Sequence, residues 1–172
     1  LWTDEANGGA EDNRPKIELG EDEKKAGKYT FSFFVSNFGA NDLSFVASSQ
    51  MFTETLSSDK LTVAEKAYLL NKIDPVWTIN ENGANSRSLA KNEAFTVKSG
   101  EYAKITVTLE LDESEKNYIN SSFPNGMFVE GFITLKSQSE GQCNLNLPYM
   151  GFYGDWESAP MLDYSAYEIA EF

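Results

Sequence analysis

The sequence predicts an all-β sandwich of about seven or eight strands with one or two short helices. Apolar and polar residues alternate with a period of two along several segments, and turn signals separate these segments at short intervals. A hydrophobic fraction of 41% and an aromatic fraction of 13% are enough for a packed core. The pattern is typical of a sandwich and differs from the alternating strands and helices of a parallel sheet.

The charge and the residue types exclude several classes of function. The 172 residues include 14 basic and 27 acidic side chains, which gives a net charge of −13 and argues against a nucleic-acid or anionic membrane partner. Histidine is absent, so no Ser-His-Asp, Cys-His or His-metal mechanism can be complete within this chain. We expect no catalytic residue, cofactor or metal in this segment, and no stretch reaches the roughly 18 apolar residues of a membrane span.

The strands are expected in the following order. The first long strand begins at Lys28, where Tyr29, Phe31, Phe33 and Val35 face one way and Phe34 interrupts the polar side. The clearest alternation runs over Tyr102–Leu111, with apolar side chains at every odd position. The remaining strands are expected at Phe45–Met51, Trp77–Ile79, Phe95–Val97, Met127–Leu135 and Cys143–Tyr149.

Two segments carry the signature of a helix start. Thr62–Glu65 fits a capping box, and Val63, Ala67 and Leu70 recur at helical spacing. Asp112 and Glu115 stand in the same relation at the start of a second short helix, expected over 112–120.

Several residues invite a chemical interpretation and also have a structural one. The acidic pairs Asp22/Glu23, Asp112/Glu113 and Asp155/Glu157 could suggest a glycosidase, but 27 acids make such pairs common by chance. A calcium loop around Glu21–Lys25 is conceivable, although the Asp/Asn spacing and central glycine of such a loop are missing. Asn120-Ser121-Ser122 fits the N-glycosylation pattern.

Aromatic and thiol side chains also have both a chemical and a structural interpretation. The aromatic residues Trp77, Tyr153 and Trp156 could form a sugar-stacking platform, or more simply pack in a core or interface. Cys143 alternates with Leu145 and Leu147, so we expect a buried, unreactive thiol.

Two C-terminal motifs resemble a known family. Asn125–Leu135 and Leu145–Trp156, followed by Ala159–Asp163, resemble the fibronectin type III-like domain that follows the catalytic domain in cell-envelope subtilisin-like serine proteases. This is the family of lactocepin and the streptococcal complement-anaphylatoxin peptidase. Lys16–Gly20 and Phe95–Leu111 match it more loosely.

The resemblance implies a fibronectin type III-like or immunoglobulin-like sandwich over 16–163. Residues 1–15 would be a flexible lead-in or linker, and 164–172 an exit segment toward a following domain. The chain starts at Leu1 without a methionine or targeting signal, so we expect a processed protein or a cut-out segment. Structural roles in the last strands and the exit are implied for Val129, Ile133, Pro148, Gly151, Gly154 and Trp156.

The implied function is non-catalytic. The domain would brace the catalytic domain of an extracellular, cell-wall-associated subtilisin-like endopeptidase on a Gram-positive surface and help to position protein substrates. Its partners would be that catalytic domain, the following domains of the same chain, and protein substrate. Two alternatives remain open: a carbohydrate- or surface-binding module, which needs exposed aromatics in a groove, and an adhesin-type structural domain.

The strand over Met127–Leu135 supplies the candidate interdomain interface. Val129 and Ile133 are expected to face the core, with Gly131 making room for close packing, while Phe128, Glu130 and Phe132 face outward. Because two outward phenylalanines need a cover, we expect the exit segment with Phe152, Tyr153 and Trp156, or the catalytic domain, to pack over them. Glu130 would then be partly desolvated and bonded to backbone amides or a base. The alternative places the phenylalanines inside and Val129 outside.

Overall fold

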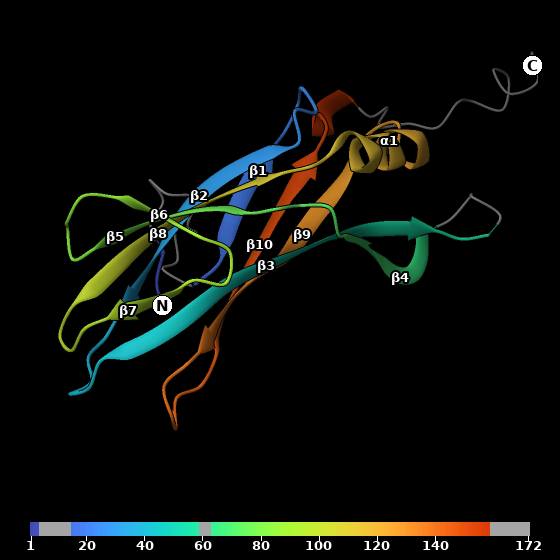
Figure 1. Cartoon of the computed structure of the whole chain (residues 1–172). Helices are drawn as coiled ribbons and strands as arrows, with labels where there is room; N and C mark the ends of the chain where they lie inside the picture. Colours follow the sequence, from blue (N-terminus) through green and yellow to red (C-terminus); the bar gives the residue numbers. More distant parts are fainter. Residues whose placement is uncertain (4–14, 59–62, 159–172) are drawn as a thin grey trace, which may run out of the picture.

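The computed structural model describes residues 1–3, 15–58 and 63–158. Two β-sheets pack face to face, with one helix at an end of the sandwich (Figure 1). The all-β sandwich is therefore confirmed, although the described part contains ten strands, more than the seven or eight expected. No helix in the described part is long and apolar enough to cross a membrane.

The larger sheet, called the six-stranded sheet below, carries the strands on which the candidate site lies. Its spatial order is β1-β10-β9-β3-β4, and β7 pairs with the first half of β3. β1 is parallel to β10, and the other neighbours are antiparallel. The bounds are β1 Ile17–Glu21, β3 Leu43–Leu56, β4 Val63–Leu70, β7 Ala94–Val97, β9 Met127–Ser137 and β10 Leu145–Tyr153.

The four-stranded sheet has the order β2-β8-β5-β6, with antiparallel neighbours throughout. Its bounds are β2 Lys28–Ser36, β5 Val76–Glu81, β6 Arg87–Leu89 and β8 Tyr102–Glu110.

The core lies between the inner faces of the two sheets. The alternating residues predicted for β2 and β8 are all buried, and they belong to one cluster with Val129, Ile133 and Leu135 of β9. Phe34, the exception in β2, points outward and is covered by Trp2, whose ring stacks on it with centroids 3.9 Å apart. Backbone hydrogen bonds between Trp2 and Phe34 hold this contact, so the first residues of the expected lead-in pair with β2. Residues 4–14 lie outside the described part.

Helix α1, Glu113–Ser122, confirms the second predicted helix. The Asp112 carboxylate accepts the Glu115 N–H at 2.8 Å, and the Glu115 side chain reaches back to the Asp112 N–H, which completes the capping box. Glu115 is buried, and its carboxylate also accepts the backbone N–H of Lys72 from the β4–β5 connection at 2.8 Å. These hydrogen bonds replace the water that the buried carboxylate loses.

The helix expected from Thr62 to Leu70 is wrong. From Val63 onward this segment is β4, which pairs antiparallel with the second half of β3 in the register Met51↔Leu70 to Leu56↔Val63. Thr62 itself lies outside the described residues. The spacing of Val63, Ala67 and Leu70 suits a helix, but the unpaired edge of β3 offers a ladder of backbone hydrogen bonds that outweighs this weak preference.

Candidate functional site

Strand β9 has one buried and one exposed face, as its alternation predicts. Val129 and Ile133 are fully buried, whereas Phe128 and Phe132 point to the outside of the six-stranded sheet. The register with the phenylalanines outside is therefore confirmed. Gly131 makes the expected room, because an added Cβ would lie 2.5 Å from the Tyr149 ring.

The outer surface of the six-stranded sheet is apolar over the half that lies near α1. Cross-strand pairing places Phe52 of β3 beside Glu130, with Leu69 of β4 on the far side of Phe52. Met150 and Phe152 of β10 lie beside β9 on its other side. Exposed fractions are 49% for Phe132, 51% for Met150 and 56% for Trp156. We call this surface the apolar face: Phe52, Leu69, Phe128, Phe132, Met150, Phe152 and Trp156.

The end of β10 and the turn after it contribute an aromatic cluster to the apolar face. The rings of Phe128, Phe152 and Trp156 lie with centroids 5.0 to 5.4 Å apart, in edge-on and tilted contacts. The Trp156 N–H donates to Glu21 Oε2 at 3.2 Å, and the Gly154 N–H donates to the Asp22 carbonyl at 3.1 Å. The exit segment thus folds back over Phe128, as one of the two expected covers.

This cover is incomplete, and one expectation needs correction. Tyr153 is only 1% exposed and belongs to the core, so it is not part of a surface interface. Its hydroxyl accepts a hydrogen bond from Asn120, the residue of the glycosylation pattern, at 3.4 Å. Glu130 is exposed in this chain, because the exit segment packs on Phe128 and leaves Phe132 half exposed. The exit segment alone therefore does not desolvate Glu130.

A hollow of about 300 Å³ lies beside Glu130, between β1 and β9. Pro148 and Met150 of β10 lie between these strands, and Lys16 at the rim forms an ion pair with Glu18 at 3.2 Å. The hollow is lined by Lys16, Ile17, Glu18, Glu130, Gly131, Phe132, Pro148, Tyr149 and Met150. Its apolar lining suits a side chain with an aliphatic stem.

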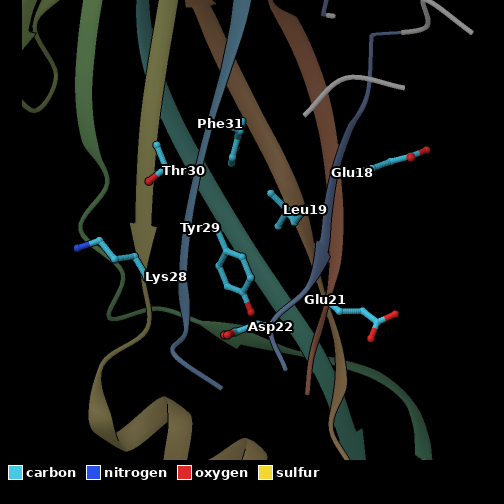
Figure 2. A pocket seen from close by; sticks show the side chains of 8 residues that line it. All are labelled: Glu18, Leu19, Glu21, Asp22, Lys28, Tyr29, Thr30 and Phe31. Atoms are coloured by element: carbon cyan, nitrogen blue, oxygen red, sulfur yellow. The ribbon is translucent and has the colours of Figure 1, made fainter. Parts of the chain in front are cut away.

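A second hollow, of about 320 Å³, lies between β1 and β2 at the open side of the sandwich (Figure 2). The Tyr29 hydroxyl points toward the Asp22 carboxylate, which accepts backbone N–H groups from Ala26 at 2.9 Å and Gly27 at 2.6 Å. Burial, together with the negative charge of Asp22, raises the pKa of Tyr29 well above its ordinary value. A phenol that stays neutral and a carboxylate that holds a turn are structural groups, and neither is an activated nucleophile.

The other candidate chemical groups do not converge on a site. Trp77 and Tyr153 are buried in the core, so they form no sugar-stacking platform with the exposed Trp156. Asp112 caps α1, and Asp155 accepts the Glu157 N–H at 2.9 Å, so these acids support local turns. Among the residues that the structure describes, no three His, Cys, Asp or Glu side chains are grouped to hold a metal ion.

The burial expected for Cys143 is wrong. Its side chain is exposed, because β10 begins only at Leu145. The Asn144 side chain accepts the Ser137 N–H at 3.0 Å and closes the β9–β10 connection before Cys143 could join the ladder. The alternation with Leu145 and Leu147 therefore does not extend to the cysteine.

Sequence reasoning found the β9 and exit residues of the apolar face and missed Phe52, Leu69 and Met150. The alternation in β3 and β10 places Phe52 and Met150 on the outer side, so it could have identified them. Leu69 was hidden because its segment is predicted as a helix.

The chain is similar to a family model and to several known proteins. A family model described as an Fn3-like domain matches residues 17–150. The PI-type proteinase of Lactococcus lactis subsp. cremoris is 31% identical over 154 residues, which are 90% of this chain and 7% of that protein. The C5a peptidase of Streptococcus pyogenes is 25% identical over 76 residues, or 44% of this chain and 6% of that protein. Among solved structures, a family 123 glycoside hydrolase from Clostridium perfringens superposes with a TM-score of 0.49 at 10% identity, over 81% of this chain and 23% of the other. The chain thus spans a small part of the length of the curated relatives that it matches.

Proposed function

The chain belongs to the Fn3-like domain family, and from this premise we propose that it is a non-catalytic accessory domain of an extracellular, cell-wall-associated, subtilisin-like serine endopeptidase. In this proposal the domain braces the catalytic domain of the longer parent chain, borders the domains that follow, and helps to position protein substrates. Two relatives that match it are named a proteinase and a peptidase, and this chain itself has no histidine.

The apolar face is the single observation that supports the bracing role. Phe132, Met150 and Trp156 are about half exposed on one outer sheet surface, and contiguous apolar patches are features that can mark interaction sites. The proposed occupant is the catalytic domain.

The test compares variants of the full-length parent chain. The double change Phe128→Ser and Phe132→Ser is expected to shorten the half-life of casein hydrolysis at elevated temperature by about fivefold or more, since each lost apolar contact is worth about 1 kcal/mol or more. The matched control is Val76→Ser, which removes an exposed apolar side chain from the four-stranded sheet. Equal half-lives for wild type, control and double variant would contradict the bracing role.

A second measurement addresses the absence of catalysis. The isolated chain is expected to hydrolyse neither casein nor a generic peptide library, because no histidine is present to act as a general base. Hydrolysis that survives repurification and serine-protease inhibitors would refute this expectation.

A further inference from the structure

Glu130 is an ionisable side chain in the middle of the apolar face, between residues of three described strands. Its neighbours along β9 are Phe128 and Phe132, and its cross-strand neighbours are Phe52 on β3 and Met150 on β10. Four apolar side chains therefore surround one exposed carboxylate on the same surface of the sheet.

The fold itself does not need this carboxylate. Glu130 lies on the outer surface of the sheet. Lys16, the basic residue that lines the same hollow, forms its ion pair with Glu18 at 3.2 Å and not with Glu130. A partner that covers the apolar face must remove Glu130 from water. Burying an ionised carboxylate is costly unless a cation pairs with it.

We propose that the surface docking on the apolar face carries one basic side chain, best an arginine, that pairs with Glu130 at the centre of an apolar contact. This inference rests on the proposed function and specifies the partner surface on the catalytic domain. A guanidinium group can donate hydrogen bonds to both carboxylate oxygens of Glu130 while its plane lies against the Phe132 ring. The hollow between β1 and β9 accommodates the aliphatic stem.

The charge of the whole chain points to the same partner chemistry. Glu18 and Glu21 lie on β1 opposite Met150 and Phe152 at the edge of the face, and the chain has a net charge of −13. An acidic partner surface would be repelled, and a purely apolar one would leave Glu130 buried without a counter-charge.

Oxidation of Met150 by hydrogen peroxide reports directly on coverage of this face. Met150 is half exposed in the isolated chain and lies opposite Glu130, while buried Met51 is an internal control for an intact fold. The rates are measured by peptide mass spectrometry in the isolated chain and in the full-length parent. The parent is compared with its Glu130→Gln, Glu130→Lys and Glu140→Gln variants. Glu140 is an exposed acid in the β9–β10 connection, outside the face, and serves as the matched control.

The expected result is a graded loss of protection. In the parent, Met150 should oxidise about tenfold more slowly than in the isolated chain. Glu130→Gln should restore most of the rate and Glu130→Lys all of it, because truncating a buried charge pair costs tenfold or more in affinity. Glu140→Gln should change nothing, and Met51 should stay protected throughout.

Two contrary results would separate failure of this inference from failure of the proposed function. If Met150 is protected in the parent and Glu130→Gln leaves that protection equal or greater, the face is covered by a surface without a basic group. The inference then fails while the proposed function stands. If Met150 oxidises equally fast in the isolated chain and the parent, nothing covers the face, and both proposals fail.

Discussion

The two sheets share the same inner surface chemistry but differ on the outside. On the four-stranded sheet the outer side chains of β2 and β8 are mainly hydroxyls, which bond in cross-strand pairs: Thr30 with Thr108 at 2.8 Å and Ser32 with Thr106 at 2.7 Å. On the six-stranded sheet the corresponding positions near α1 form the apolar face. An antiparallel sheet commonly has one polar, solvated face, as the four-stranded sheet does in β2 and β8, and the apolar surface on the other sheet is the basis for the contact proposed above.

The apolar face also ends abruptly along its own strands. Toward the β9–β10 connection the outer positions turn polar, and the Thr134 hydroxyl donates to Asn146 at 2.8 Å. The change from apolar to polar falls within single strands. The apolar character is therefore confined to one part of the six-stranded sheet, which is the distribution expected if the proposed partner docks there.

The largest expected effect comes from filling the space under the apolar face. Gly131→Ala should destabilise the isolated chain by about 3 kcal/mol, because the new methyl group would collide with the Gln50 carbonyl and the Tyr149 ring. Gly39→Ala, whose added Cβ meets only the Asn37 side chain at 3.3 Å, should change stability by less than about 1 kcal/mol. Urea unfolding measures both, and equal effects would disprove the close packing at Gly131.

The second comparison sets the inner face of β9 against its outer face. Ile133→Ala should cost about 3 kcal/mol, since it opens a cavity at a fully buried position. Phe132→Ala in the isolated chain should cost less than about 1 kcal/mol, because the ring is half exposed and its proposed partner is absent. The opposite order in urea unfolding would mean that the register of β9 is reversed.

A pair of buried tyrosines, one in each sheet, gives a smaller difference. The Tyr149 hydroxyl donates to the Gln50 carbonyl at 2.8 Å and lies 3.1 Å from Ser49 Oγ. The buried Tyr29 hydroxyl points toward the Asp22 carboxylate, but its geometry does not meet the criterion of a hydrogen bond to any described residue. Tyr149→Phe should therefore destabilise by about 1 kcal/mol, while Tyr29→Phe should be neutral or stabilising. Thermal unfolding of the two variants decides this, and a larger loss for Tyr29→Phe would contradict the assignment.

The raised pKa values of the same tyrosines predict a smaller effect, a dependence of the free energy of unfolding on pH. Burial raises the pKa of Tyr149 and of Tyr29 above the ordinary value of about 10. Between that value and the raised folded-state pKa, the unfolded chain binds fewer protons than the folded one. Stability is thus fully present below about pH 10 and falls as the pH rises further. Urea unfolding at increasing alkaline pH should show this decline, with a shallower slope in Tyr149→Phe; an unchanged slope would contradict the raised pKa of Tyr149.

Two identical sequence signatures show what could be predicted from the chain and what could not. Asp112 with Glu115 and Thr62 with Glu65 both fit a capping box, yet only the first begins a helix. At α1 the local signal is reinforced by Glu115, whose buried carboxylate also binds the Lys72 N–H. At β4 the segment pairs with the free edge of β3, a contact between distant residues that no local pattern encodes.

The candidate site likewise has features that the sequence pattern predicts and features that it does not. The alternation in β9 was sufficient to place Phe128 and Phe132 on the outside, because a strand has only two faces. The burial of Tyr153 and the exposure of Cys143 depend on where β10 begins and ends, and alternation alone does not set these limits. The cover over Phe34 was also beyond local reasoning, because Trp2 reaches it from 32 positions earlier in the chain.

Hydroxyl-radical footprinting of both outer surfaces, in the isolated chain and in the full-length parent, tests the central claim most directly. Side-chain oxidation is followed at Phe132 and Trp156 on the six-stranded sheet, and at Val76 and Tyr102, which are exposed on the four-stranded sheet. The account predicts strong protection of Phe132 and Trp156 in the parent, with Val76 and Tyr102 oxidised as fast as in the isolated chain. Equal oxidation of Phe132 in both samples, or protection confined to the four-stranded sheet, would contradict it.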